Sequence, residues 1–337
     1  MVQVFENYPL TAFNTFGLPV KTRYFASVNT LAEVEELAAS NQFGDKLVLG
    51  GGSNLLFTKD YDGLVLHNAL KGMVVSDESD EQVWITAQGG EGWHDLVQYC
   101  VRNNWGGIEN LSLIPGSVGA APIQNIGAYG VEVKDMFVQL EALHLPTGEL
   151  HIFTHDDCCF GYRNSIFKQA LKGKYFISSV TLKLNKHPQF NLQYGEVQRT
   201  LEQLGYANPT VAAMSDAICH IRSAKLPNPV ELGNCGSFFK NPEISQALFQ
   251  PLQAEYPNLP NYPAPNEQIK IPAAWLIEQC GFKGMRSGNT GTHVNHALVI
   301  VNYGNASGGE IRDFAMLIQQ TVLKRFGILL EAEVNIL

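Results

Sequence analysis

The sequence predicts an α+β protein of two to three domains, and three observations support this class. The chain has 337 residues, of which 45% are hydrophobic, enough to fill more than one packed core. Helical and strand-like periodicities both occur along it, with no internal repeat. In Lys225-Leu226-Pro227-Asn228-Pro229, two prolines would stop a helix and stiffen a connection. We therefore place a domain boundary at this segment.

The first region combines a helix with a strand. Asn29-Thr30 supplies an N-cap for a helix with one apolar face over 31–38. An apolar strand over 47–49 follows and runs into the glycine turn at 50–54. From about Met73 to Leu184 strands dominate. We expect them over 83–86, 137–143 and 150–153, with a turn at 146–148 and one helix over 93–102.

The remainder of the chain is mainly helical. After Lys186-His187-Pro188 we expect helices over 196–204 and 211–222. Beyond the proline boundary, the pattern predicts helices over 244–255, 272–279 and 310–326, and a strand over 297–301. A final strand would carry Glu331 and Glu333 on one face, because side chains alternate along a strand.

Composition excludes several classes of protein. The net charge of −9 argues against sequence-independent binding of nucleic acid, which depends on many Lys and Arg at phosphates. The N-terminus has neither the basic start nor the apolar stretch of a signal peptide, and no apolar run is long enough to span a bilayer. Six cysteines without a Cys-x-x-Cys pair favour reduced thiols in the cytoplasm over disulfides or a zinc site.

The run from Ile114 to Gly130, Ile-Pro-Gly-Ser-Val-Gly-Ala-Ala-Pro-Ile-Gln-Asn-Ile-Gly-Ala-Tyr-Gly, is the most informative stretch of the chain. Glycine-rich turns bring backbone N–H groups against phosphate oxygens, and bulky side chains would prevent that approach. With the turn at Gly50-Gly51-Gly52, this run suits the pyrophosphate of a dinucleotide. Plain turns are the alternative. Neither loop is a Gly-x-Gly-x-x-Gly or Walker motif, which disfavours Rossmann and P-loop enzymes.

Three residues are candidates for chemistry. Arg163, in a half-apolar loop, offers a fixed fork for a carboxylate or phosphate, with a structural arginine as the alternative. Ser237, between glycine and two aromatic residues, is a candidate acid or nucleophile, although a turn serine is the default. No Gly-x-Ser-x-Gly elbow surrounds it, so hydrolysis by a triad is disfavoured. Glu333 is a candidate functional acid if it points inward.

A metal site is not expected. His151 and His155, followed by Asp156-Asp157, resemble a metal cluster only superficially. His293-Val294-Asn295-His296 lacks the His-Glu-x-x-His pattern of zinc proteases. Lys225, Lys240 and Tyr194 or Tyr262 would together suit a nucleotide diphosphate.

With these residues in place, the chain closely resembles the UDP-N-acetylenolpyruvoylglucosamine reductase family, in its longer form. The resemblance covers essentially the whole chain, and its motifs occur in the family's order. They are Asn14-Thr15-Phe16-Gly17, the segments 49–56 and 114–130, Gly161-Tyr162-Arg163-Asn164-Ser165-Ile166-Phe167, Lys225-Leu226-Pro227, the segment 233–242, Ala273-Ala274-Trp275-Leu276-Ile277-Glu278 and Leu330-Glu331-Ala332-Glu333-Val334.

The resemblance implies a fold and a reaction. The fold would be the FAD-binding vanillyl-alcohol-oxidase or PCMH type, with FAD-binding subdomains over 1–70 and 71–224, an α+β substrate-binding domain over 225–326, and a C-terminal strand over 327–337 returning to the active site. The reaction would be the NADPH-dependent reduction of UDP-N-acetylglucosamine-enolpyruvate to UDP-N-acetylmuramate. That step serves peptidoglycan synthesis, and so cell-wall biogenesis, cell shape and cell division.

The resemblance also implies roles for residues. Arg163 and Glu333 would stabilise an enolate-like intermediate, and Ser237 would protonate the carbon next to the one that receives hydride. The residues that would hold the UDP-sugar are Tyr162, Tyr194, Lys225, Asn241 and Tyr262. Those that would hold noncovalent FAD are Gly50, Gly51, Gly52, Ser53, Asn54, Ile114, Pro115, Gly116, Ser117, Gly119, Ala120, Gln124, Asn125, Gly127, Tyr129 and Arg222.

Two further points concern the substrate loop and partners. Leu259-Pro260-Asn261-Tyr262-Pro263 resembles the loop that closes over substrate in the longer form of the family, whereas His296 stands where close relatives are expected to have glutamine. We expect a cytoplasmic monomer with small-molecule partners, no nucleic acid and no membrane insertion. The rival interpretations are an FAD oxidase of the same fold, which would use oxygen, and a catalytically silent nucleotide-sugar-binding protein.

Overall fold

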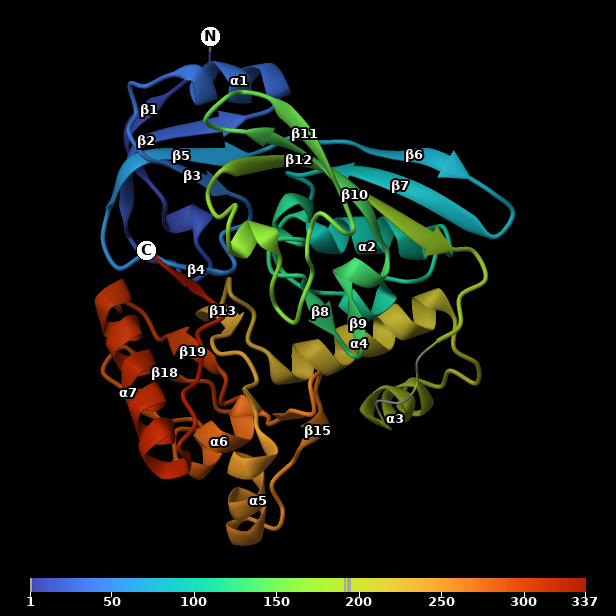
Figure 1. Ribbon diagram of the computed structural model, residues 1–337, viewed down its shortest axis with the longest axis vertical. Coiled ribbons are helices and arrows are strands. Elements are labelled where there is room, and N and C mark those ends of the chain that lie inside the picture. Colours follow the sequence, from blue (N-terminus) through green and yellow to red (C-terminus); the bar gives the residue numbers. More distant parts are fainter. Residues whose placement is uncertain (1, 191, 193–194) are drawn as a thin grey trace. The chain divides into compact units, whose positions relative to one another are not determined.

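The computed structural model describes residues 2–190, 192 and 195–337, and the chain forms two compact units (Figure 1). Unit 1 comprises Met1–Tyr8, Lys21–Gly52 and Tyr61–Ala224, and unit 2 comprises Pro9–Val20, Ser53–Asp60 and Lys225–Leu337. The chain therefore passes between the units several times before it leaves unit 1 for the last time at Ala224. The Tyr194 position, expected to bind substrate, lies outside the described residues.

The first sheet of unit 1 is mostly parallel, in the order β1-β2-β5-β3. Helix α1 (Leu31–Ala39) connects β2 to β3, and its Thr30 N-cap forms a capping box with Glu33. Residues of α1, β2 and β5 share one core with Leu143 and Phe176. The strands are β1 (Phe5–Pro9), β2 (Lys21–Val28), β3 (Lys46–Leu49) and β5 (Tyr61–Asn68).

The second sheet of unit 1 is antiparallel, in the order β11-β10-β12-β7-β6. Helix α2 (Trp93–Arg102) places its apolar side, including Trp93 and Leu96, in one core with β7, β10 and β12 (Figure 1). The strands are β6 (Met73–Glu78), β7 (Gln82–Gln88), β10 (Phe137–His144), β11 (Leu150–Thr154) and β12 (Tyr175–Asn185). A short hairpin pairs β8 (Gly127–Ala128) with β9 (Val131–Glu132).

Two helices complete unit 1. α3 (Gly195–Gln203) packs its buried face on α4 (Val211–Lys225), and Tyr129 lies against this small core. Cys219 and Arg222 lie in the last two turns of α4.

Unit 2 has a four-stranded antiparallel sheet in the order β13-β19-β18-β17. Helices α6 (Ala273–Gln279) and α7 (Gly308–Phe326) contribute to one large core with it and with α5 (Gln246–Glu255). Helix α7 begins after a Ser307–Glu310 capping box and is capped at its C-terminus by Gly327, whose φ of +68° favours glycine. The strands are β13 (Gly233–Ser237), β17 (Arg286–Ser287), β18 (Thr290–Thr292) and β19 (Val299–Asn302).

Two smaller sheets belong to unit 2. β14 (Glu243–Ile244), β16 (Ile269–Lys270) and β15 (Tyr262–Pro263) form one, in that order. β4 (Leu55–Leu56), which follows the first glycine turn, pairs in parallel with β20 (Asn335–Ile336). The end of that turn is thereby joined to the last residues of the chain.

The structure confirms the expected helices and strands, with one exception and shifts of one to three residues at several ends. The strand expected around Glu331 and Glu333 is wrong, because the structure records only an isolated bridge there, between Ala332 and Phe239. The segment that pairs here follows β13, which ends at Ser237, and it soon reaches Pro242, which has no amide hydrogen to extend a ladder.

Candidate functional site

The two glycine loops of the expected cofactor site contact each other in unit 1. A Cβ atom on Gly51 would lie 2.9 Å from the Cα of Gly116, and one on Gly50 would collide with the Oγ of Ser117. Gly119 is equally confined, because a Cβ there would lie 3.0 Å from the carbonyl oxygen of Ile177. The sequence suggested that glycines allow backbone to approach a ligand. The structure adds that they allow two loops to approach each other.

These contacts predict that the protein binds about one noncovalent FAD per chain and that Gly51→Ala weakens that binding by about tenfold or more. The added methyl group forces the two loops apart, and a displacement of that kind in a packed position costs about 1–3 kcal/mol. Gly195→Ala is the matched control, because a Cβ there meets nothing within 4 Å. FAD fluorescence after ultrafiltration measures retention. Equal retention by Gly51→Ala and wild type would show that the loops do not hold the cofactor.

Arg222 on α4 has a buried guanidinium nitrogen that could donate a hydrogen bond to a ligand. Its Nη2 donates to the carbonyl oxygen of Leu113 at 3.4 Å, while its buried Nε has no hydrogen-bond partner among the described residues. Burial lowers the pKa of Arg222, and the nearby Arg163 lowers it further, whereas Tyr129 and Cys219 raise it. An unsatisfied guanidinium nitrogen is costly unless an acceptor reaches it. The group therefore fits the anionic or carbonyl oxygens of FAD.

Asn125 has a structural role that the sequence did not suggest. Its side chain accepts the N–H of Lys134 at 3.0 Å and donates to Glu132 and to the carbonyl of Gly161, both at 3.0 Å. The residue is fully buried with φ +45°. These bonds hold the end of the long loop, so any contact of Asn125 with FAD would come from its backbone.

Asn54, the last residue of the first glycine turn, belongs to unit 2. Its side chain donates to the carbonyl of Glu333 at 3.4 Å, and its own carbonyl accepts the N–H of Asn335 at 3.1 Å. The structure thus brings an expected cofactor residue to the backbone of an expected catalytic one.

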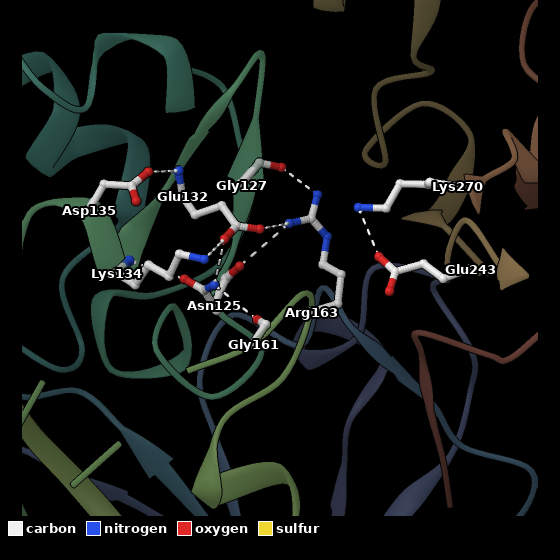
Figure 2. A network of polar contacts seen from close by, with 9 residues as sticks. All are labelled: Asn125, Gly127, Glu132, Lys134, Asp135, Gly161, Arg163, Glu243 and Lys270. Atoms are coloured by element: carbon white, nitrogen blue, oxygen red, sulfur yellow. Dashed lines mark hydrogen bonds and ion pairs between the residues drawn. The ribbon is translucent and has the colours of Figure 1, made fainter. Parts of the chain in front are cut away.

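Arg163 is held by the Asn125 to Glu132 segment of unit 1 (Figure 2). Its guanidinium donates to the carbonyl oxygens of Gly127 and Asn125, and it lies 3.9 Å from a carboxylate oxygen of Glu132. Its backbone is left-handed, with φ +51°. Glu132 in turn pairs with Lys134 at 2.7 Å. The sequence did not single out Glu132, because no local pattern marks a carboxylate that fixes a distant arginine.

The neighbours of Arg163 fix its direction. The Tyr162 ring lies beside the guanidinium, with 5.4 Å from the ring centroid to Cζ. Such a contact favours a cation over an aromatic face. With carbonyl acceptors on one side and the ring on another, the guanidinium is an ordered fork.

Ser237 and Glu333 are brought together in unit 2. The N–H of Glu333 donates to the carbonyl of Phe238, next to Ser237, at 2.9 Å. Ser237 is half-buried at the end of β13, and within the described part of the chain no hydrogen bond is made by its Oγ. Burial raises the pKa of the Cys235 thiol, and Glu333 raises it further, which places the Glu333 carboxylate near this strand.

Glu331 differs from Glu333 in its surroundings. Its exposed carboxylate pairs with Lys240 at 2.5 Å, and its carbonyl accepts the Lys240 N–H. This pair neutralises a lysine that the sequence suggested for a diphosphate. Arg163 belongs to unit 1, whereas Ser237 and Glu333 belong to unit 2.

The expected substrate residues of unit 2 have distinct environments. Asn241 accepts the N–H of Ala273 at 2.9 Å at the start of α6, which directs its amide. Tyr262 is 57% exposed on β15, beside Lys270, whose Nζ pairs with Glu243 at 3.1 Å (Figure 2). Lys225 is exposed at the end of α4.

His296 faces a basic environment. Its Nδ1 is buried without a hydrogen-bond partner in the portion of the chain that the structure describes. Burial is the main cause that lowers the pKa of His296. The nearby Lys225, His293 and Lys283 lower it further, whereas Glu278 raises it. A neutral imidazole beside Lys225 is therefore the form that the fold favours.

Two features typical of other protein classes are absent among the described residues. No group of three or more His, Cys, Asp or Glu side chains there is arranged to hold a metal ion. No helix among them is both long and apolar enough to cross a membrane. The six cysteines are free thiols.

Comparisons with known proteins point to one family, and together they cover the whole chain. Residues 228–337 match the family described as UDP-N-acetylenolpyruvoylglucosamine reductase, C-terminal domain, and residues 22–154 match an FAD binding domain family. The chain is 46% identical to the UDP-N-acetylenolpyruvoylglucosamine reductase of Flavobacterium johnsoniae over 337 residues, covering 100% of both chains. It is 48% identical to that of Pseudomonas putida, covering 99% of each.

A solved structure shares the fold. The crystal structure of the reductase of the same name from Thermus caldophilus covers 100% of this chain and 98% of its own, with a TM-score of 0.67 and 23% sequence identity. At that identity the likeness concerns the fold alone.

Proposed function

Because this chain belongs to the UDP-N-acetylenolpyruvoylglucosamine reductase family, we propose that its residues carry out that family's reaction in the roles set out below. Relatives with 46–48% identity across the whole chain carry this conclusion. The chain is an FAD-dependent oxidoreductase with the PCMH-type FAD-binding fold and a C-terminal domain. It reduces the enolpyruvyl group of UDP-N-acetylglucosamine-enolpyruvate to give UDP-N-acetylmuramate in peptidoglycan synthesis.

The residues of the glycine loops fit the cofactor. The Gly51–Gly116 approach leaves no room for side chains, and the buried Nε of Arg222 lacks a protein partner among the described residues. FAD, when bound, supplies a hydride to the terminal carbon of the enol ether. The loops would hold its pyrophosphate through backbone N–H groups, and Arg222 would donate to an oxygen of the cofactor. NADPH is the reductant that we propose.

Arg163 would stabilise negative charge on the substrate. Addition of hydride leaves charge conjugated to the substrate carboxylate, and a guanidinium with fixed direction meets that charge without reorganising. The bonds to Asn125 and Gly127 and the ring of Tyr162 supply the fixed direction.

Ser237 would donate the proton. Its hydroxyl stands at the end of β13, after an irregularity in the pairing with β19 where Gly236 has φ +72°. A serine is a weak acid, but a carbanionic centre is a strong base, so the transfer is feasible. Glu333, held by its N–H on the neighbouring carbonyl of Phe238, would act on the same intermediate. Next to a carboxylate it must be protonated or compensated by a cation.

The UDP-sugar would contact polar side chains. Lys225 is a cation suited to phosphate, and Asn241 has its amide oriented by the bond to Ala273. Tyr162 and Tyr194 complete the proposed set, the latter outside the described residues. We further propose a cytoplasmic monomer that serves cell shape and division through its product. Formation of UDP-N-acetylmuramate, one per NADPH consumed, tests the proposal; consumption of NADPH without that product would refute it.

Tyr262→Ala should raise the Michaelis constant for the sugar nucleotide about 3- to 10-fold, as expected for one lost hydrogen bond of about 0.5–1.5 kcal/mol, and lower turnover less. The ring is exposed on the edge strand β15, where it can cover a ligand. Steady-state kinetics with Tyr262→Phe as the matched variant separates the ring from the hydroxyl. An equal fall in turnover and efficiency, with an unchanged Michaelis constant, would instead place this side chain in the transition state.

A further inference from the structure

Leu113, the residue immediately before the Ile114 to Gly130 loop, has an unfavourable backbone. Its φ is +60°, a left-handed conformation that a residue with a Cβ rarely adopts. The residue is 37% exposed, so it is not anchored in the core. Something outside the residue must hold it.

Two side chains hold the backbone of Leu113. His94 Nδ1 accepts the Leu113 N–H at 2.9 Å, and Arg222 Nη2 donates to the Leu113 carbonyl at 3.4 Å. An Nδ1 that accepts carries no proton, so His94 is neutral and protonated on Nε2. A single strained residue is therefore held between α2 and α4.

The start of α2 holds the loop at neighbouring points too. The Trp93 N–H donates to the carbonyl of Gly116 at 3.0 Å, and the Trp93 indole donates to the carbonyl of Leu111 at 3.1 Å. Neither of these bonds involves a titratable group. Of these three contacts from α2, only the one made by His94 depends on pH.

Charged groups act on His94 from both helices. Burial lowers the pKa of His94 most; Asp95, its neighbour on α2, raises it, and Arg222 on α4 lowers it. Protonation would remove the acceptor for Leu113 and place a second cation beside the Arg222 guanidinium. Both effects act against the arrangement seen here.

We propose that His94 is a positioning residue for the cofactor: its neutral ring holds Leu113, and through it the glycine loop and Arg222, in the conformation that binds FAD. The inference rests on the proposed FAD binding. Because the folded state favours the neutral ring, the contribution of His94 is complete above the ordinary histidine pKa of about 6.5 and is lost as pH falls below it.

The test compares FAD retention by wild type, His94→Asn and His94→Leu between pH 5 and pH 8. In His94→Asn, the introduced amide oxygen can accept at the place of Nδ1 and does not titrate. Wild type should lose affinity about tenfold as pH falls through the histidine range, as for a lost hydrogen bond with added repulsion. His94→Asn should be independent of pH there, and His94→Leu weak throughout. His155→Asn, which replaces an exposed histidine of unit 1, is the control.

The apoprotein gives a second measurement that does not need activity or cofactor. The Leu113 amide resonance should titrate together with the His94 ring, with a midpoint below about 6.5, and should stop titrating in His94→Asn. Equal FAD affinity of all variants at every pH, or a Leu113 amide that does not follow His94, would overturn the inference. A wild type that binds no FAD at any pH would instead contradict the proposed function, and the amide titration would still decide the role of His94.

Discussion

Ser237→Ala should leave the reduction of bound flavin by NADPH nearly intact and slow its reoxidation by the enolpyruvyl sugar nucleotide about 10²-fold or more, in the range for loss of a positioned general acid. The physical reason is that Ser237 is assigned to protonate substrate carbon and takes no part in accepting hydride from NADPH. Its Oγ makes no hydrogen bond among the described residues, so its removal should not disturb the fold. Stopped-flow absorbance at the flavin band separates the two half-reactions.

The control for this prediction is Ser287→Ala, which replaces an exposed serine on β17 of the same unit. It should behave as wild type in both half-reactions. If Ser237→Ala reoxidises at the wild-type rate, Ser237 is a structural turn residue and another group supplies the proton.

Glu333→Gln should impair the same half-reaction, about 10²- to 10³-fold, through lost stabilisation of the enolate-like intermediate. The substitution keeps the size of the side chain and its backbone bond to Phe238, so the change reports the carboxyl group itself. Glu331→Gln, two residues earlier and exposed beside Lys240, is the matched control and should leave reoxidation unchanged. Equal rates for Glu333→Gln and Glu331→Gln would remove Glu333 from the catalytic set.

Much of the secondary structure could be predicted from local pattern. The helix expected over 93–102 is α2 with the same bounds, and its apolar stripe at helical spacing is buried in the core. The N-cap expected at Thr30 is present with its hydrogen bond to Glu33. Patterns of this kind depend only on residues close in sequence.

Other features depend on contacts between distant residues and could not be predicted. Pro9–Val20 and Ser53–Asp60 belong to unit 2 through bonds such as Asn302 to the carbonyl of Phe16 and Asn335 to that of Asn54. Leu113 has a left-handed backbone, but leucine, unlike glycine or asparagine, is not a residue type that predicts this conformation. Glu132 and His94 orient residues that are distant in sequence, so no local sequence pattern marks them. The glycine loops and the motifs around Ser237 and Arg163 are continuous segments that can be recognised in the sequence.

The measurement that tests the central claim most directly is the absorption spectrum of the purified protein under anaerobic conditions. The account predicts a flavin band that NADPH bleaches and that UDP-N-acetylglucosamine-enolpyruvate then restores, with UDP-N-acetylmuramate formed in equal amount. An FAD oxidase of the same fold would regain its band with oxygen and not with the enolpyruvyl substrate. A protein that is folded but colourless and takes up no added FAD, or a bleached band that the substrate does not restore, would contradict the account.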